Sequence, residues 1–123
     1  VPDNGLALLQ PIHVLDLAVS FRLAVENPRS IGEHYNICLS HAVPLKRYHE
    51  ITAAVFGKTA HLNYIPLEEM LRKYEGKVHE IGLRFLATHM CFSIEKAVRD
   101  LGYKPHCTPE EAIEETALWA SKQ

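Results

Sequence analysis

Residues 11–18 read PIHVLDLA and residues 32–37 read GEHYNI, and these two stretches decide the fold that the sequence predicts. The first includes the end of an apolar run over 6–14, which has the length of a mostly buried strand. Asp16 follows this run after Leu15 and belongs to the residue types that cap helices, so we expect a helix to follow. The second stretch opens another apolar run, over 34–39. A strand, a helix and a strand in succession predict a βαβ unit, whose crossover should be right-handed.

The helix expected after Asp16 carries apolar side chains at the spacing of one helix face. They are Leu17, Ala18, Phe21, Ala24 and Val25. This spacing predicts that they face the core of the protein. The pair Asn27 and Pro28 should end the helix, because proline cannot continue its hydrogen bonds.

Beyond residue 40 the pattern becomes helix-rich. Prolines suited to the first turn of a helix precede apolar residues at helical spacing. Residues 108–111 read TPEE, with the threonine, proline and glutamate of a capping box. We therefore expect an α/β fold in a single domain or fragment over 1–123, with a βαβ segment over 1–40 and a helix-rich lobe over 41–123.

The composition limits the classes to which the protein can belong. A chain of 123 residues, 47% hydrophobic and 23% charged, suits one globular domain or a piece of one. The net charge of −2 argues against a nucleic-acid-binding protein, which would need a basic surface. No apolar run approaches the ~18 residues of a membrane span, so we expect no membrane association. Three cysteines without CxxC spacing are typical of reduced thiols in a cytoplasmic protein.

Four segments, in this order, resemble the carboxy-terminal third of the extended short-chain dehydrogenase/reductases, the NAD-dependent epimerase/dehydratase family. They are residues 11–18, residues 32–37, residues 93–105, and residues 108–112 with Trp119. The resemblance covers nearly the whole chain. It implies that the βαβ segment is the terminal piece of a dinucleotide-binding sheet and that the rest is a small substrate-binding lobe. The opening VPDNG also reads like the interior of a longer polypeptide.

The cofactor and catalytic motifs of that family do not occur in this sequence. The glycine-rich turn that would hold a pyrophosphate is missing, and none of the five tyrosines has a lysine four residues later. The resemblance therefore implies that a missing amino-terminal dinucleotide-binding portion supplies the catalytic residues and the NAD or NADP. This chain alone is expected to bind neither cofactor and to have no catalytic residue of its own.

Three residues are candidates for contacting a small-molecule substrate. Arg84 matches, approximately, an arginine that grips a nucleotide-sugar diphosphate in the family, and its planar fork suits an anion. The alternative is a solvated arginine on a helix. His89 is the other polar candidate near it. Gln10 stands where the family usually has a second arginine, which points to a smaller or less anionic substrate, although an ordinary strand-end glutamine fits as well.

The eight histidines raise the possibility of a metal site, but their spacing fits no local metal-binding motif, and we expect no metal. His13, inside the first predicted strand, is interpreted as a hydrogen-bonded core histidine. No cysteine has the basic neighbour at a helix start that would favour a nucleophile.

Two functions of different classes follow from these observations. The first is the substrate-binding portion of an NAD(P)-dependent epimerase, dehydratase or reductase that acts on a small molecule, a sugar derivative being one option. The alternative is a stand-alone, non-catalytic binding or oligomerisation module derived from that fold. The chain by itself is expected to form a homo-oligomer, because its strands lack most of the neighbours of a parallel sheet.

Overall fold

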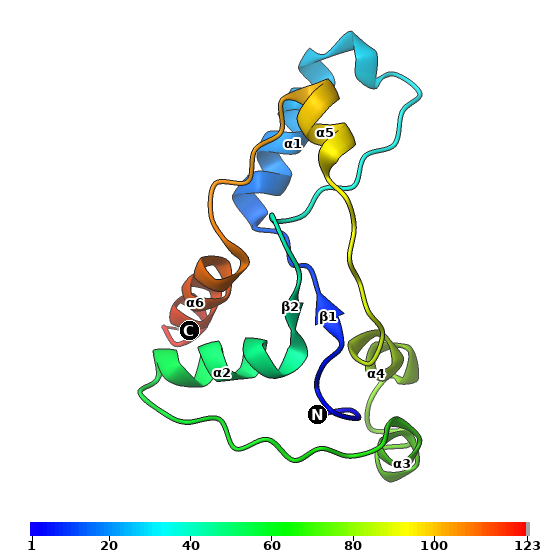
Figure 1. Cartoon of the computed structure of the whole chain (residues 1–123), viewed down its shortest axis with the longest axis vertical. Coiled ribbons are helices and arrows are strands. Elements are labelled where there is room, and N and C mark those ends of the chain that lie inside the picture. The colour runs from blue at the N-terminus through cyan, green and yellow to red at the C-terminus, as the bar shows by residue number, and fades with distance from the viewer. Residues whose placement is uncertain (123) are drawn as a thin grey trace.

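The computed structural model of the protein describes residues 1–122. Its elements, in chain order, are β1 (Leu8–Leu9), α1 (Val14–Glu26), the 3₁₀ turn η1 (Pro28–Ser30), β2 (Val43–Pro44), α2 (Leu45–Val55), α3 (Leu67–Lys73), α4 (Glu80–Leu86), α5 (Glu95–Leu101) and α6 (Pro109–Ala120). The described chain is therefore rich in short helices around a small sheet (Figure 1). None of the helices over 1–122 has the length and apolar character needed to cross a membrane.

The sheet lies at the centre of the molecule and is antiparallel. Leu8 of β1 is paired with Pro44 of β2, and Leu9 with Val43 (Figure 1). The chain that follows α4 also bonds to β1, since the amide of Met90 donates to the carbonyl of Leu8 at 2.7 Å. Segments from three parts of the sequence thus meet along β1.

The expected parallel pair of strands is not formed within residues 1–122. The first predicted strand, 6–14, is reduced to β1, and the second, 34–39, has no strand pairing. One backbone bond joins them, from the amide of Leu39 to the carbonyl of Pro11 at 2.9 Å. A parallel ladder is stable mainly when it is buried between further strands and helices, and Pro11 has no N–H with which to extend this one. The mixed α/β character is present, whereas a dinucleotide-binding sheet remains a prediction.

The cap of α1 also differs from the prediction. The helix begins at Val14, and the cap is His13, whose Nδ1 accepts the amide of Leu15 at 3.2 Å. Asp16, predicted as the cap, lies in the first turn and is buried. Its carboxylate is engaged by a distant residue, described below, and so it is not used for the helix end.

The apolar stripe predicted for α1 exists but faces solvent. Phe21 is 66% exposed and Val25 88% exposed, whereas the buried residues of the helix are Asp16 and Ser20. The expectation that the stripe faces the core is therefore wrong for the described chain. Periodicity defines which side chains share a face, but that face is buried only where another surface covers it.

The helices beyond residue 40 agree better with their sequence signals. The helices α2 and α6 pack together, and Val43, Ile51 and Ile113 form a small core between them. The capping box of α6 is confirmed: the amide of Glu111 donates to Oγ1 of Thr108, and the Glu111 carboxylate accepts the Thr108 amide at 2.7 Å.

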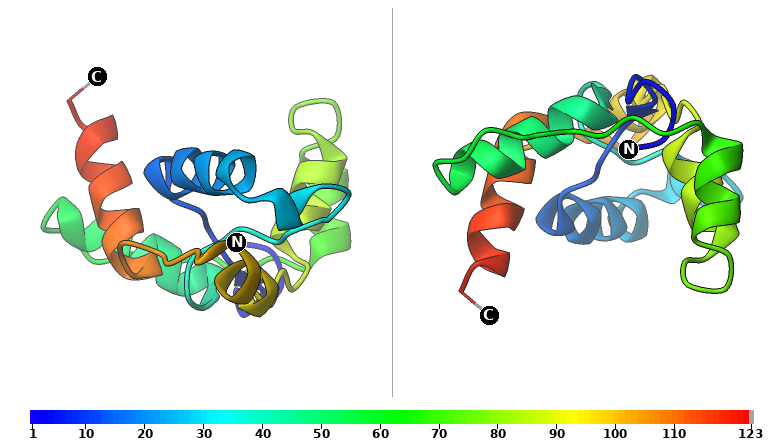
Figure 2. Two further views of the ribbon diagram at one scale, coloured as in Figure 1. Left: turned by 90° about the horizontal axis from the view of Figure 1, so that it is seen from above. Right: turned by 90° about the horizontal axis from the view of Figure 1, so that it is seen from below.

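Late segments of the chain pack against early ones. The helix α5 packs beside α1 and η1 (Figure 1), and it ends at Gly102, whose left-handed φ of 69° suits glycine. Tyr103, directly after it, is buried and donates its hydroxyl to the carbonyl of Cys38. The ranges 1–40 and 41–123 therefore interleave in space. Seen along the long axis, α6 and the pair α3–α4 project to the same side of the molecule as α1 (Figure 2).

Candidate functional site

Arg84 lies on the surface of α4 and is held by two carboxylates. Its Nε donates to Glu80 at 2.8 Å, one turn earlier in the same helix, and its Nη1 contacts Glu68 of α3 at 3.4 Å. The hydrogen bond with Glu80 is the main reason why the pKa of Arg84 is raised. In this arrangement the guanidinium links α3 to α4, and its charge is already partly balanced.

His89 lies just after α4, beside β1. Its Nδ1 accepts the amide of Leu8 at 3.2 Å, so the neutral ring carries its proton on Nε2. The residue lines a cavity of about 270 Å³ together with Pro2, Asp3, Asn4, Leu6, Ala7 and Ala87. Arg84 is not part of this lining, so the structure does not bring the two candidates into one pocket.

Gln10 forms a bridge between backbone segments. Its Oε1 accepts the amide of Phe92 at 2.7 Å, and its Nε2 donates to the carbonyl of Leu39 at 2.8 Å. Both ends of the amide are thus used to join the chain just after β1 to the segments around Leu39 and Phe92. This arrangement fits the alternative of a structural glutamine at a strand end.

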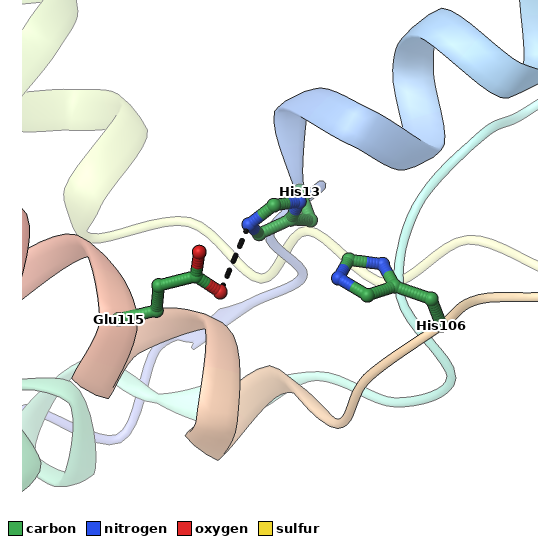
Figure 3. A group of neighbouring side chains, drawn as sticks. All are labelled: His13, His106 and Glu115. Carbon is green, nitrogen blue, oxygen red and sulfur yellow. Dashed lines mark ion pairs between the residues drawn. The ribbon is translucent and has the colours of Figure 1, made fainter.

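The sequence analysis did not anticipate a second group of side chains, which we call the histidine cluster: His13, Asp16, His106 and Glu115. His13 Nε2 lies 3.3 Å from Glu115 Oε2 on α6, and His106 Nδ1 lies 2.9 Å from Asp16 Oδ1 on α1 (Figure 3 shows all but Asp16). The two imidazole rings meet edge to face, with their centroids 4.4 Å apart.

The contacts of the cluster favour particular proton positions. Asp16 accepts the backbone amide of His106, and its Oδ1 lies 2.9 Å from the ring Nδ1, which favours a proton on Nδ1 and a lone pair on Nε2 of the neutral ring. Figure 3 shows a ring nitrogen of His106 directed toward His13 and Glu115. His13 accepts a backbone amide at Nδ1, so the proton of the neutral ring is on Nε2, which lies 3.3 Å from the Glu115 carboxylate.

A cavity of about 440 Å³ adjoins the cluster. Its lining combines His13 and Glu115 with the side chains of Val14, Leu15, Thr116 and Trp119. An apolar wall with a few convergent polar groups, at this volume, is typical of a small-molecule site.

Cys107 lies beside the cluster, and its sulfur is close to the ligand atoms of Asp16 and His106. Burial, followed by the negative charge of Asp16, raises the pKa of the Cys107 thiol above its ordinary value. The reactive thiolate is therefore disfavoured, and Cys107 is a poor candidate for a nucleophile.

Sequence reasoning missed the cluster because its members are distant in the chain. Asp16 and His106 are ninety positions apart, and neither is part of a local metal or catalytic motif. One signal was available, since a carboxylate in the first turn of a helix after a buried segment can itself be buried, and a buried carboxylate needs a partner. The sequence did not show which residue would be the partner of Asp16.

A search of protein-family models found no match to this chain, and none was found among curated protein sequences.

Proposed function

We propose that this chain is the carboxy-terminal, substrate-binding portion of an NAD(P)-dependent epimerase, dehydratase or reductase that acts on a small molecule such as a sugar derivative. The resemblance of its four sequence segments to the epimerase/dehydratase family is the starting point. An amino-terminal dinucleotide-binding portion would supply the NAD or NADP and the catalytic residues. We expect the cytoplasm as its compartment, in keeping with the free cysteines.

The observation that carries this proposal is the uncovered apolar face of α1. Each valine, leucine or phenylalanine side chain, when buried, contributes about 1.5–3 kcal/mol, yet Phe21 and Val25 are exposed. Such a face is typical of a surface that another part of a protein covers. Helices of a dinucleotide-binding fold pack on the faces of its parallel sheet. We therefore expect the sheet of the proposed amino-terminal portion to cover the apolar face of α1.

Arg84 is the first residue that we expect to contact the substrate, and His89, which lines a cavity without Arg84, is the second candidate. The guanidinium suits an anionic group, but Glu80 and Glu68 already balance part of its charge. Gln10, moreover, stands where a second arginine would be expected. Both features favour a substrate less anionic than a nucleotide-diphosphate sugar.

The test is to express this chain together with its natural upstream coding sequence. We expect the longer product to bind NAD or NADP at micromolar concentration in titration calorimetry, and the 123-residue chain to bind neither. Hydrogen exchange should slow in α1 of the longer product relative to the shorter chain, with α2 as the internal reference. Absence of dinucleotide binding together with unchanged exchange in α1 would reject the proposal.

The rival function is a stand-alone binding or oligomerisation module, in which a second copy covers the same face of α1. The same experiment separates the two. A reading frame that starts immediately before Val1, with slow exchange in α1 only at concentrations where the chain self-associates, would favour the module.

A further inference from the structure

We propose that His13, His106 and Glu115 bind a divalent transition-metal ion, for which zinc is the best match, with one coordination position open toward the adjoining cavity. One ligand atom from each of these residues lies within 4.8 Å of those of the other two. Two imidazoles and one carboxylate are a donor set that zinc uses when it keeps a fourth position for water or a bound molecule.

The distances allow the site to close around an ion. Zinc bonds of about 2.0–2.1 Å in a tetrahedron place ligand atoms roughly 3.3–3.5 Å apart. His13 Nε2 and Glu115 Oε2 are already 3.3 Å apart. The remaining pairs, which lie within 4.8 Å, must approach by up to about 1.5 Å, and the side chains that must move are the exposed ones. His106 is 42% and Glu115 64% exposed, whereas His13 is buried and serves as the fixed ligand.

Asp16 provides an independent argument for a metal. Metal-binding histidines usually donate their second ring N–H to a carboxylate, which sets the tautomer and the direction of the ring. Asp16, itself buried, lies 2.9 Å from Nδ1 of His106 and is placed to act in this way, while the other ring nitrogen is directed toward the other two ligands (Figure 3). The buried Asp16 carboxylate also accepts the backbone amide of His106, which holds this histidine against the first turn of α1.

The choice of metal follows from the donor atoms. Magnesium and calcium prefer oxygen, and only one of the three donors is a carboxylate. Imidazole nitrogen favours zinc and its neighbours among the transition metals.

His13 sets a limit on the affinity. Its Nδ1 caps α1, so metal binding at Nε2 requires the proton to move to Nδ1 and the cap bond to Leu15 to break. Part of the metal-binding free energy is therefore spent on the helix end. We expect a dissociation constant in the micromolar range, weaker than that of a closed four-ligand structural site.

The open coordination position determines which chemistry the bound ion would supply. Three protein ligands leave room for a fourth, which faces the cavity of about 440 Å³ lined by Trp119 and Leu15. A bound water there is acidified by zinc, and an anionic or carbonyl oxygen of a small molecule can replace it. Trp119 lies one helix turn after Glu115, so its fluorescence should change when the ion occupies the site.

The experiment uses the tag-free 123-residue chain and the metal alone. Zinc is titrated by calorimetry, and Co²⁺ replaces it so that the visible absorption of a tetrahedral ion can be recorded. The variants His106→Ala and Glu115→Gln remove one ligand each, and both positions are exposed. The matched controls are His61→Ala, an exposed histidine outside the cluster, and Glu114→Gln, the neighbour of Glu115.

We expect one zinc ion per chain, Co²⁺ bands of a tetrahedral site, and roughly tenfold or greater weakening in each ligand variant. The two controls should bind within about twofold of the parent chain. Binding that His61→Ala weakens as much as His106→Ala would identify adventitious surface histidines and overturn the proposal, as would the absence of micromolar binding. If circular dichroism shows that His106→Ala is unfolded, the comparison of Glu115→Gln with Glu114→Gln decides the question.

Discussion

Replacement of Tyr103 by phenylalanine tests how the late part of the chain is anchored to the early part. Tyr103 is 1% exposed, and its hydroxyl donates to the carbonyl of Cys38 at 3.1 Å. A hydrogen bond of this kind contributes about 0.5–1.5 kcal/mol, and a buried acceptor left without a donor adds to the cost. We therefore expect Tyr103→Phe to lower the free energy of unfolding by about 1–2 kcal/mol at pH 7.

The same substitution has a second effect at high pH. Burial, followed by the negative charge of Asp16, raises the pKa of Tyr103 to about 12, against about 10 in an unfolded chain. Because the folded state favours the protonated phenol, its contribution is complete below about pH 10 and is lost as the pH rises toward 12. At about pH 11 the loss amounts to roughly 1 kcal/mol, so the two proteins should become nearly equal in stability.

The assay is urea unfolding followed by circular dichroism at pH 7 and at steps between about pH 9 and 11. Tyr64→Phe is the control, because the Tyr64 side chain is exposed, and it should change stability by less than about 0.5 kcal/mol. Equal stability of Tyr103→Phe and the parent at pH 7 would refute the anchoring role. A difference that persists unchanged at pH 11 would refute the burial of an un-ionised phenol.

Three further outcomes are expected. Thr108→Ala should cost about 1 kcal/mol in thermal unfolding by breaking the capping box, whereas Thr108→Ser should be nearly neutral; equal melting temperatures for both would contradict this. In the longer product, Arg84→Ala should lower kcat/KM by roughly tenfold or more with little loss of stability, and an effect within about twofold would remove Arg84 from the substrate site. Sedimentation equilibrium should find the 123-residue chain as a dimer or larger, and Phe21→Glu should dissociate it while Phe56→Glu, a control on the exposed end of α2, does not; a monomeric parent chain would dismiss the idea.

The helices that depend on local signals were predictable. The capping box over 108–111 and the helix end at Gly102 arise from contacts within a few residues, so the sequence contains all the information that they need. The inward side chains of α2, among them Leu45 and Ile51, are buried because α6 and β2 are present to receive them.

The cap of α1 shows where such reasoning fails. Asp16 has the right residue type and position, yet His13 takes the cap and Asp16 turns to His106. Both side chains are suitable acceptors for the first amides, and the local sequence does not rank them. Asp16 instead accepts the amide of His106, ninety positions later in the chain. The location of His106 depends on the packing of α5 and α6.

By itself the sequence determined which segments are helical, where α6 begins, and which side chains of α1 form an apolar face, because these properties repeat over short distances along the chain. Only the tertiary structure decided that this face is uncovered, that the sheet is antiparallel, and that two histidines meet Asp16 and Glu115. Pairing and burial are properties of surfaces brought together from distant positions, and their free energy depends on what lies opposite. A sequence pattern shows which side chains a segment presents on one face, and the tertiary structure determines which surface packs against that face.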